Sequence, residues 1–202
     1  MRNKIALFVI LVWISIFCTG CTLAVESQAN QIIGDFEAVI GEANGYVETE
    51  DPNRLMVATE LDELEALTER VDTQLKMYTA QMLTLIESYQ ALEGQIDQDS
   101  FDNNLIWMQD NYMVFELLRL LSVLSGKERA WDINVSRANN TFDIWAYCGD
   151  FSSDCETIEA EANALGIEET DDELITSSYD FLMEKLEEAD ELVFYAIMEM
   201  DG

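Results

Sequence analysis

Cysteines are the residues of this chain whose spacing first suggests chemistry. Cys18 and Cys21 flank two small residues in the stretch CTGC, which is the spacing of redox and zinc motifs. Cys148 and Cys155 form a second pair within YCGDFSSDCE. A thioredoxin-like site needs a strand and a helix around its cysteines, and a structural zinc site needs four ligands. Neither context is present, because CTGC ends an apolar run and the sequence has no histidine to complete a metal site.

The position of CTGC, at the end of an N-terminal apolar run, indicates an export signal rather than an active site. A short basic start precedes an apolar run over residues 5–17, which is the pattern of a secretory signal. Thr19-Gly20-Cys21 resembles the lipobox of prokaryotic lipoproteins, although Cys18 stands where leucine is usual. The resemblance implies cleavage after Gly20 and lipidation of Cys21. Ordinary cleavage and an uncleaved membrane anchor are the alternatives.

These signals divide the chain into a signal segment over residues 1–20 and a single helical-bundle domain over residues 21–202. We predict an exported protein that a lipid or an anchor holds on the extracytoplasmic face of a prokaryotic cell envelope. Cleavage after Gly20 leaves three cysteines, so one of them has no disulfide partner. Lipidation of Cys21 would account for that cysteine. Cys148 and Cys155 are then predicted to form a disulfide in an oxidising compartment.

The charge of the chain restricts its partners. Asp and Glu number 41 against 10 Lys and Arg, so the formal net charge is −31. Phosphate backbones and anionic lipids attract clustered basic residues, and the sequence therefore excludes nucleic acid as a partner and electrostatic adhesion to anionic membranes. The simplest interpretation is a solvated acidic surface. A site for a cation or for a cationic partner is the alternative.

Hydrophobic spacing predicts an all-α fold. A single proline and nine glycines disfavour a turn-rich sheet. Apolar residues alternate at intervals of four and three, which is typical of helices that pack lengthwise. We predict an antiparallel bundle of four to five long helices with coiled-coil-like packing, preceded by the signal or anchor segment. The expected helices cover about 32–43, 52–96, 105–124 (ending at Ser125-Gly126), 131–147, a short 155–165 and a last helix that Thr170–Glu173 caps.

Catalytic constellations are not found in the sequence. Without histidine there is no Ser-His or Cys-His pair and no di-iron motif of the ferritin type. Asp150, Asp154 and Glu156 lie close together in sequence but lack the spacing of a calcium loop. We therefore predict no enzyme activity, no catalytic or metal-binding residue and no cofactor. Asn134 and Asn139 begin two possible N-glycosylation sequons.

The predicted role is a structural or protein-interaction bundle tethered to a membrane, with a protein partner of unknown identity. The main alternative is a bundle that binds a small molecule or signal in a pocket lined by aromatic side chains. Candidates for that lining are Trp107, Trp131, Trp145, Tyr78 and Tyr89, although core packing explains the same residues. A hydrolytic or metal-dependent enzyme that uses carboxylates alone is a third alternative.

Overall fold

The computed structural model describes the backbone of residues 2–55, 57–167 and 172–200, and side chains from residue 24 onward except at 50, 56, 168–171 and 199–202. Within these residues the chain is all-helical and has no strand. Five long helices pack together with one short helix. They are α1 (Arg2–Val47), α2 (Glu50–Leu55), α3 (Leu61–Gln90), α4 (Gln98–Arg137), α5 (Thr141–Asn163) and α6 (Glu173–Met200).

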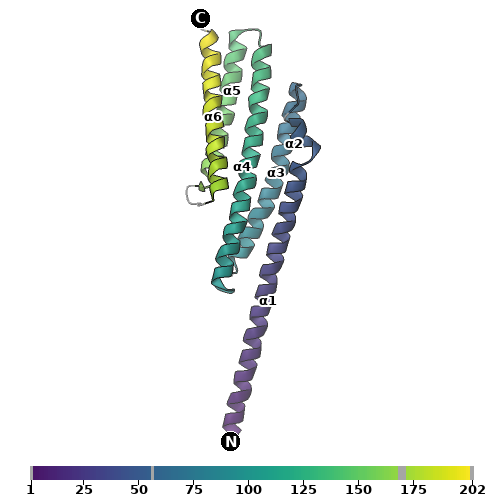
Figure 1. Ribbon diagram of the computed structural model, residues 1–202, viewed down its shortest axis with the longest axis vertical. Helices are drawn as coiled ribbons and strands as arrows, with labels where there is room; N and C mark the ends of the chain where they lie inside the picture. Colours follow the sequence, from purple (N-terminus) through teal and green to yellow (C-terminus); the bar gives the residue numbers. More distant parts are fainter. Residues whose placement is uncertain (1, 56, 168–171, 201–202) are drawn as a thin grey trace.

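The long helices run alternately up and down (Figure 1). Helix α1 rises along α3 and its N-terminal half extends beyond the other helices, whereas α5 and α6 lie on the opposite side of α4. Helix α4 contacts α1, α3, α5 and α6 and is therefore the centre of the bundle. The predicted central helix over 105–124 lies within it. Among the described residues, no helix has an apolar stretch of the length that crossing a membrane needs.

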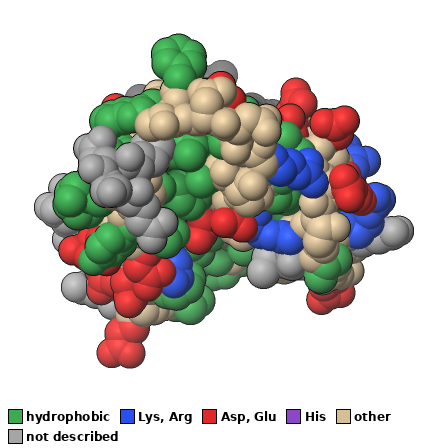
Figure 2. Space-filling model, turned by 90° about the horizontal axis from the view of Figure 1, so that it is seen from above, with side chains coloured by type: hydrophobic (Ala, Val, Ile, Leu, Met, Phe, Trp, Pro, Cys, Tyr) green, Lys and Arg blue, Asp and Glu red, His purple; other side chains and the backbone are tan. Residues whose placement is uncertain are grey.

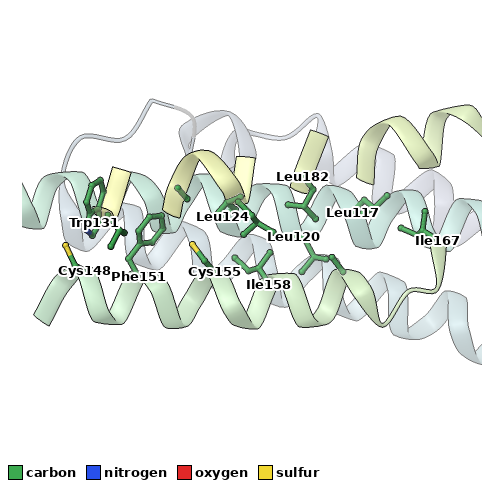
Figure 3. Packing of buried hydrophobic residues seen from close by; sticks show 14 of the residues in the cluster. Leu117, Leu120, Leu124, Trp131, Cys148, Phe151, Cys155, Ile158, Ile167 and Leu182 are labelled. Atoms are coloured by element: carbon green, nitrogen blue, oxygen red, sulfur yellow. The ribbon is translucent and has the colours of Figure 1, made fainter. Parts of the chain in front are cut away.

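Buried side chains form two main cores on opposite sides of α4. One core joins α1, α3 and the first half of α4, where Phe36 meets Trp107 edge-on at a ring separation of 5.3 Å. The other joins the second half of α4 to α5 and α6 and includes the stacked rings of Trp131 and Phe151 (Figure 3). The four-three stripe predicted in the second helix is confirmed in α3, where these members are buried: Leu64, Thr68, Val71, Leu75, Tyr78, Met82 and Tyr89.

The single helix predicted over 52–96 is wrong, because the chain breaks between α2 and α3. The Arg129 guanidinium of α4 donates hydrogen bonds to the carbonyl oxygens of Leu55 and Ala58. These bonds satisfy backbone groups that a helix end leaves without partners. Val57, which the predicted stripe placed in the core, is 71% exposed. At the other end α3 stops at Gln90, and Gly94 adopts a left-handed φ of 70° beyond it.

The helix end predicted at Ser125-Gly126 is also wrong, because α4 continues to Arg137. Gly126 serves close packing instead. A Cβ atom at this position would lie 2.1 Å from Oγ1 of Thr68 on α3. That hydroxyl is held in place, because it donates a 2.8 Å hydrogen bond to the Leu64 carbonyl. Glycine therefore permits the close approach of α3 and α4 at this point.

The predicted helix over 131–147 straddles a real interruption at residues 138–140. Asn140 is the N-cap of α5, and its side-chain oxygen accepts a hydrogen bond from the Asp143 amide at 3.0 Å. The interruption resets the helical phase, so Phe142 and Trp145 are exposed rather than buried with Trp131. The cysteine loop and the short helix over 155–165 are both wrong, since α5 runs unbroken to Asn163.

Two other predicted caps are displaced. Ser100 is not the cap of α4. Instead the Asp97 carboxylate accepts hydrogen bonds from the Ser100 amide and hydroxyl, and this lowers the pKa of Asp97. Thr170 and Asp171 of the predicted capping box lie outside the described residues, while Asp172 accepts from the amides of Leu174 and Ile175 and so caps α6.

The Gly126→Ala variant is expected to lose about 1–3 kcal/mol of folding stability, as overpacking a tight helix crossing does. Gly149→Ala is the matched control, because Gly149 lies in the interior of α5 and its Cβ would meet nothing within 4 Å. Its higher helix propensity should add about 0.5–1 kcal/mol. Urea unfolding followed by circular dichroism measures both. Stabilisation by Gly126→Ala would contradict the close approach.

Candidate binding groove beside a buried ion cluster

Cys148 and Cys155 do not form the predicted disulfide in the structure, where both are free and buried. They lie seven positions apart on α5 and point to the same side of it (Figure 3). Seven residues of helix rise about 10 Å, which exceeds the roughly 7 Å between Cα atoms that a disulfide can bridge. The two thiols instead pack as small apolar groups in the core of α4, α5 and α6. Cys18 and Cys21 lie outside the residues whose side chains are described.

The Cys155 thiol is held in its neutral form. Burial, reinforced by the negative charges of Asp190, Asp154 and Glu128, raises its pKa to about 12. A thiolate is the reactive form of cysteine, so this thiol is inert near neutral pH. Because the folded pKa is raised, the neutral thiol stabilises the fold below the pKa of the unfolded chain, near 8.5. That contribution is lost as the pH rises from there toward 12.

Native protein at pH 8 is expected to leave Cys148 and Cys155 unmodified by iodoacetamide, and unfolding in urea should expose both to alkylation. Intact-mass analysis under non-reducing conditions should find both thiols free. Peptide mapping distinguishes them from the N-terminal cysteines. A Cys148–Cys155 cross-link in the native chain would contradict the helical conformation of α5.

A buried ion cluster joins three helices around Arg119, whose side chain on α4 is only 6% exposed. Its Nε donates to Glu116 one turn earlier at 2.8 Å, and its Nη1 donates to Asp72 of α3 at 2.8 Å. Its Nη2 donates to Glu161 of α5. Lys76 adds a second cation, 2.9 Å from Asp72. One guanidinium thus connects α3, α4 and α5.

The electrostatics of this cluster suit structure rather than catalysis. Burial alone disfavours the charged guanidinium, but the hydrogen bonds to Glu161 and Asp72 and the charge of Glu116 outweigh it and raise the pKa of Arg119. The three carboxylates converge on a permanent cation, so they do not form a pair that could share a proton. Among the described side chains, no three of Cys, Asp or Glu gather where they could hold a metal ion.

Arg119→Met is expected to cost about 3 kcal/mol of stability, because it leaves the buried Glu116 carboxylate without a counter-charge. Lys185→Met is the control, since the Lys185–Glu188 pair lies on the exposed surface of α6. Surface pairs contribute about 0–1 kcal/mol, so this variant should stay close to the wild type. Chemical denaturation at pH 7 compares the two. Equal stabilities for both variants would show that the cluster does not hold the helices together.

A groove of about 510 Å³ lies beside the ion cluster, between α3, α4 and α5. This volume is within the range of small-molecule sites. Asp72 belongs to both features, since it lines the groove and pairs with Arg119. The groove is lined by Glu65, Thr68, Glu69 and Asp72 from α3, by Val123, Gly126, Lys127, Ala130, Trp131 and Asn134 from α4, and by Tyr147, Asp150, Phe151 and Asp154 from α5.

Trp131 is the unusual member of the groove wall. Its side chain is 8% exposed, its ring stacks on Phe151 at 5.3 Å, and its Nε1 is buried without a hydrogen-bond partner. An unsatisfied buried donor costs about 1–3 kcal/mol. Opposite charges bridge the groove near it, because Lys127 of α4 binds Asp154 of α5 at 3.1 Å.

The predicted site residues are only partly brought together. Of the five aromatic candidates for a pocket, Trp131 alone lines the groove. Tyr78 and Tyr89 are buried in the other core, where Trp107 is half-buried, and Trp145 is 49% exposed on α5. Asp150 and Asp154 line the groove one turn apart, whereas Glu156 is exposed and does not line it. These three acidic residues do not form a calcium site.

The two possible glycosylation residues have different surroundings. Asn139 is exposed in the connection between α4 and α5. Asn134 is half-buried in the last turns of α4 and lines the groove. Modification at either residue stays a prediction.

Sequence reasoning missed Arg119 and Tyr147. Arg119 is the only basic residue in the mostly apolar stretch 105–124, where a basic side chain that becomes buried needs acidic partners, and this was the available signal. Tyr147 carries no signal of its own, because only the helix break at residues 138–140 sets the direction in which it points. Comparison of the chain with models of known families, with curated proteins and with solved structures finds no match.

Proposed function

We propose that this chain is a lipoprotein of a prokaryotic cell envelope, in which a helical bundle outside the membrane docks a basic, apolar segment of another protein. The single observation that carries the docking role is the exposed apolar surface of α6. The lipid anchor rests on the CTGC motif and on the apolar run before it. The four-three spacing of the buried residues in α3 supports coiled-coil-like packing as part of this proposal.

Membrane attachment at the N-terminus agrees with the course of α1. Cleavage after Gly20 would remove most of the half of α1 that extends beyond the other helices (Figure 1), and the remaining helix would lead from the lipidated Cys21 into the bundle. The opposite end of the bundle, where α6 ends and α4 joins α5, therefore points away from the proposed membrane. Such an arrangement leaves that end accessible to a partner.

Large apolar side chains are exposed at that distant end. In the last turns of α6, Phe194 is 58% exposed and Tyr195 is 60% exposed. Phe142 and Trp145 of α5, which begins at the same end, are 81% and 49% exposed. The view onto this end shows hydrophobic side chains at the surface beside acidic ones (Figure 2). Helices α5 and α6 contact each other, and exposed aromatic side chains on neighbouring helices at one end of a bundle are typical of interaction surfaces.

The charge around the apolar surface selects the partner. Along α6 the exposed side chains also include Glu184, Glu187, Glu188, Asp190 and Glu191. Few basic residues offset them, since the whole chain has only 10 Lys and Arg. Complementary potentials steer association and exclude wrong partners. The expected partner segment is therefore apolar along one side and rich in Lys and Arg along its edges.

Lipidation makes a prediction about the mature N-terminus. Mass spectrometry of the protein from native membranes should find a chain that begins at Cys21 and carries acyl groups. Cys21→Ser should abolish the modification, whereas Cys18→Ser should leave it intact because Cys18 departs with the signal. An unmodified N-terminus beyond residue 21 would contradict the lipid anchor.

Docking is tested by a photo-crosslinking residue at Tyr195, with Ile106 as the matched control. Ile106 is 56% exposed on α4 but lies near the other end of the bundle. In living cells, Tyr195 should give an adduct whose peptide map identifies a second protein through a Lys- and Arg-rich apolar segment, and Ile106 should not. Adducts with lipid or with copies of this chain alone, or equal adducts at both positions, would contradict the proposal.

A further inference from the structure

We propose that the groove between α3, α4 and α5 binds a small organic cation of the amine or quaternary ammonium class. This site is separate from the docking surface of α6 and does not depend on it. Three independent properties of the groove support the assignment: its charge, its aromatic wall and its size.

Carboxylates dominate the rim of the groove. Five acidic side chains line it against one basic side chain, Lys127. Lys127 neutralises Asp154, and Asp72 pairs with Arg119 and Lys76. The side chains of Glu65, Glu69 and Asp150 have no ion pair or hydrogen bond within the described residues, and they flank the groove from α3 and α5. Glu65 and Glu69 lie one turn apart and repel each other, so a bound cation relieves this repulsion.

The wall of the groove is aromatic. Trp131, Phe151 and Tyr147 line it from α4 and α5, with Trp131 and Phe151 stacked. Figure 3 shows these two rings beside each other at one end of the core. A ring face attracts an ammonium group, and Trp attracts it most strongly.

The same observations disfavour other occupants of the groove. No described set of three acidic or thiol groups is placed to coordinate a metal ion, and an apolar wall offers a metal no ligand. A helical peptide would need a long continuous surface, whereas this groove has a volume of about 510 Å³. An apolar body that carries one positive charge matches both the wall and the rim.

Isothermal titration calorimetry on the full chain in a neutral detergent tests the site, with choline as the probe. The control ligand is 3,3-dimethylbutan-1-ol, which has the same shape without the charge. Choline is expected to bind at one site per chain and the alcohol at least tenfold more weakly, because only the cation meets the carboxylates and the ring faces.

The variant Glu65→Gln with Glu69→Gln should weaken choline binding by about threefold to tenfold, since it removes two nearby charges without altering a buried contact. Glu184→Gln with Glu187→Gln changes the net charge equally on α6 and should leave binding unchanged. Trp131→Leu should abolish binding where circular dichroism shows that the variant folds.

Three results would overturn the proposal. If choline binds no more tightly than the neutral alcohol, the groove is an apolar site that does not select a positive charge. Equal weakening by both pairs of glutamine substitutions would assign binding to the overall negative charge. No binding of choline to the wild-type chain would leave the groove without the proposed ligand class. None of these results bears on the lipid anchor or on the α6 surface.

Discussion

The arrangement of the bundle depends on the need to neutralise one buried cation. Arg119 lies on the central helix, where a side chain 6% exposed cannot reach bulk water. A buried guanidinium is tolerated only when its donors are paired, and its partners come from α3, α4 itself and α5. The hydrogen bonds from Arg119 to Asp72 and Glu161 are directional, so together with the hydrophobic core they restrict how α3, α4 and α5 sit on one another.

Close packing and the groove follow from this restriction. Less than two turns from the ion cluster along α4, Val123 and Gly126 begin the wall of the groove, and Gly126 lets α3 approach α4 closely. Helix α5 is held to the same neighbourhood by Glu161 and by Asp154, which pairs with Lys127. The groove lies between these three helices, next to the level of the ion cluster. Asp72 lies where the ion cluster and the groove meet, because it belongs to both.

Particular residues show how far the sequence predicts this structure. The stripe from Leu64 to Tyr89 repeats at four and three, and it predicted the buried face of α3 because helical periodicity is a local property. The helix ends were harder to predict. The break after Leu55 is stabilised by Arg129, more than 70 residues away, and Gly126 is explained by Thr68 on another helix. Between Cys148 and Cys155, a glycine and polar residues suggested a loop, but packing against α4 and α6 overrode their low helix propensity.

The same distinction applies to the candidate site. Composition predicted an acidic protein with an affinity for cations as an alternative, yet 41 acidic residues offered no means of choosing among them. Tertiary structure distinguishes Glu65 and Glu69 from most other acidic residues, because they line the same groove as aromatic rings of α4 and α5. It also separates the ion cluster, where carboxylates have a structural partner, from the groove, where three of them have none within the described residues.

The most direct test of this account is a double-mutant cycle between Asp72→Asn and Glu161→Gln, measured by urea unfolding. Asp72 and Glu161 stand on different helices and each binds Arg119. If Arg119 couples α3 to α5, the two free-energy changes should depart from additivity by about 0.5 kcal/mol or more, and this coupling should vanish when Arg119 is Met. Additive changes in the wild-type background, or coupling that persists without Arg119, would contradict the account.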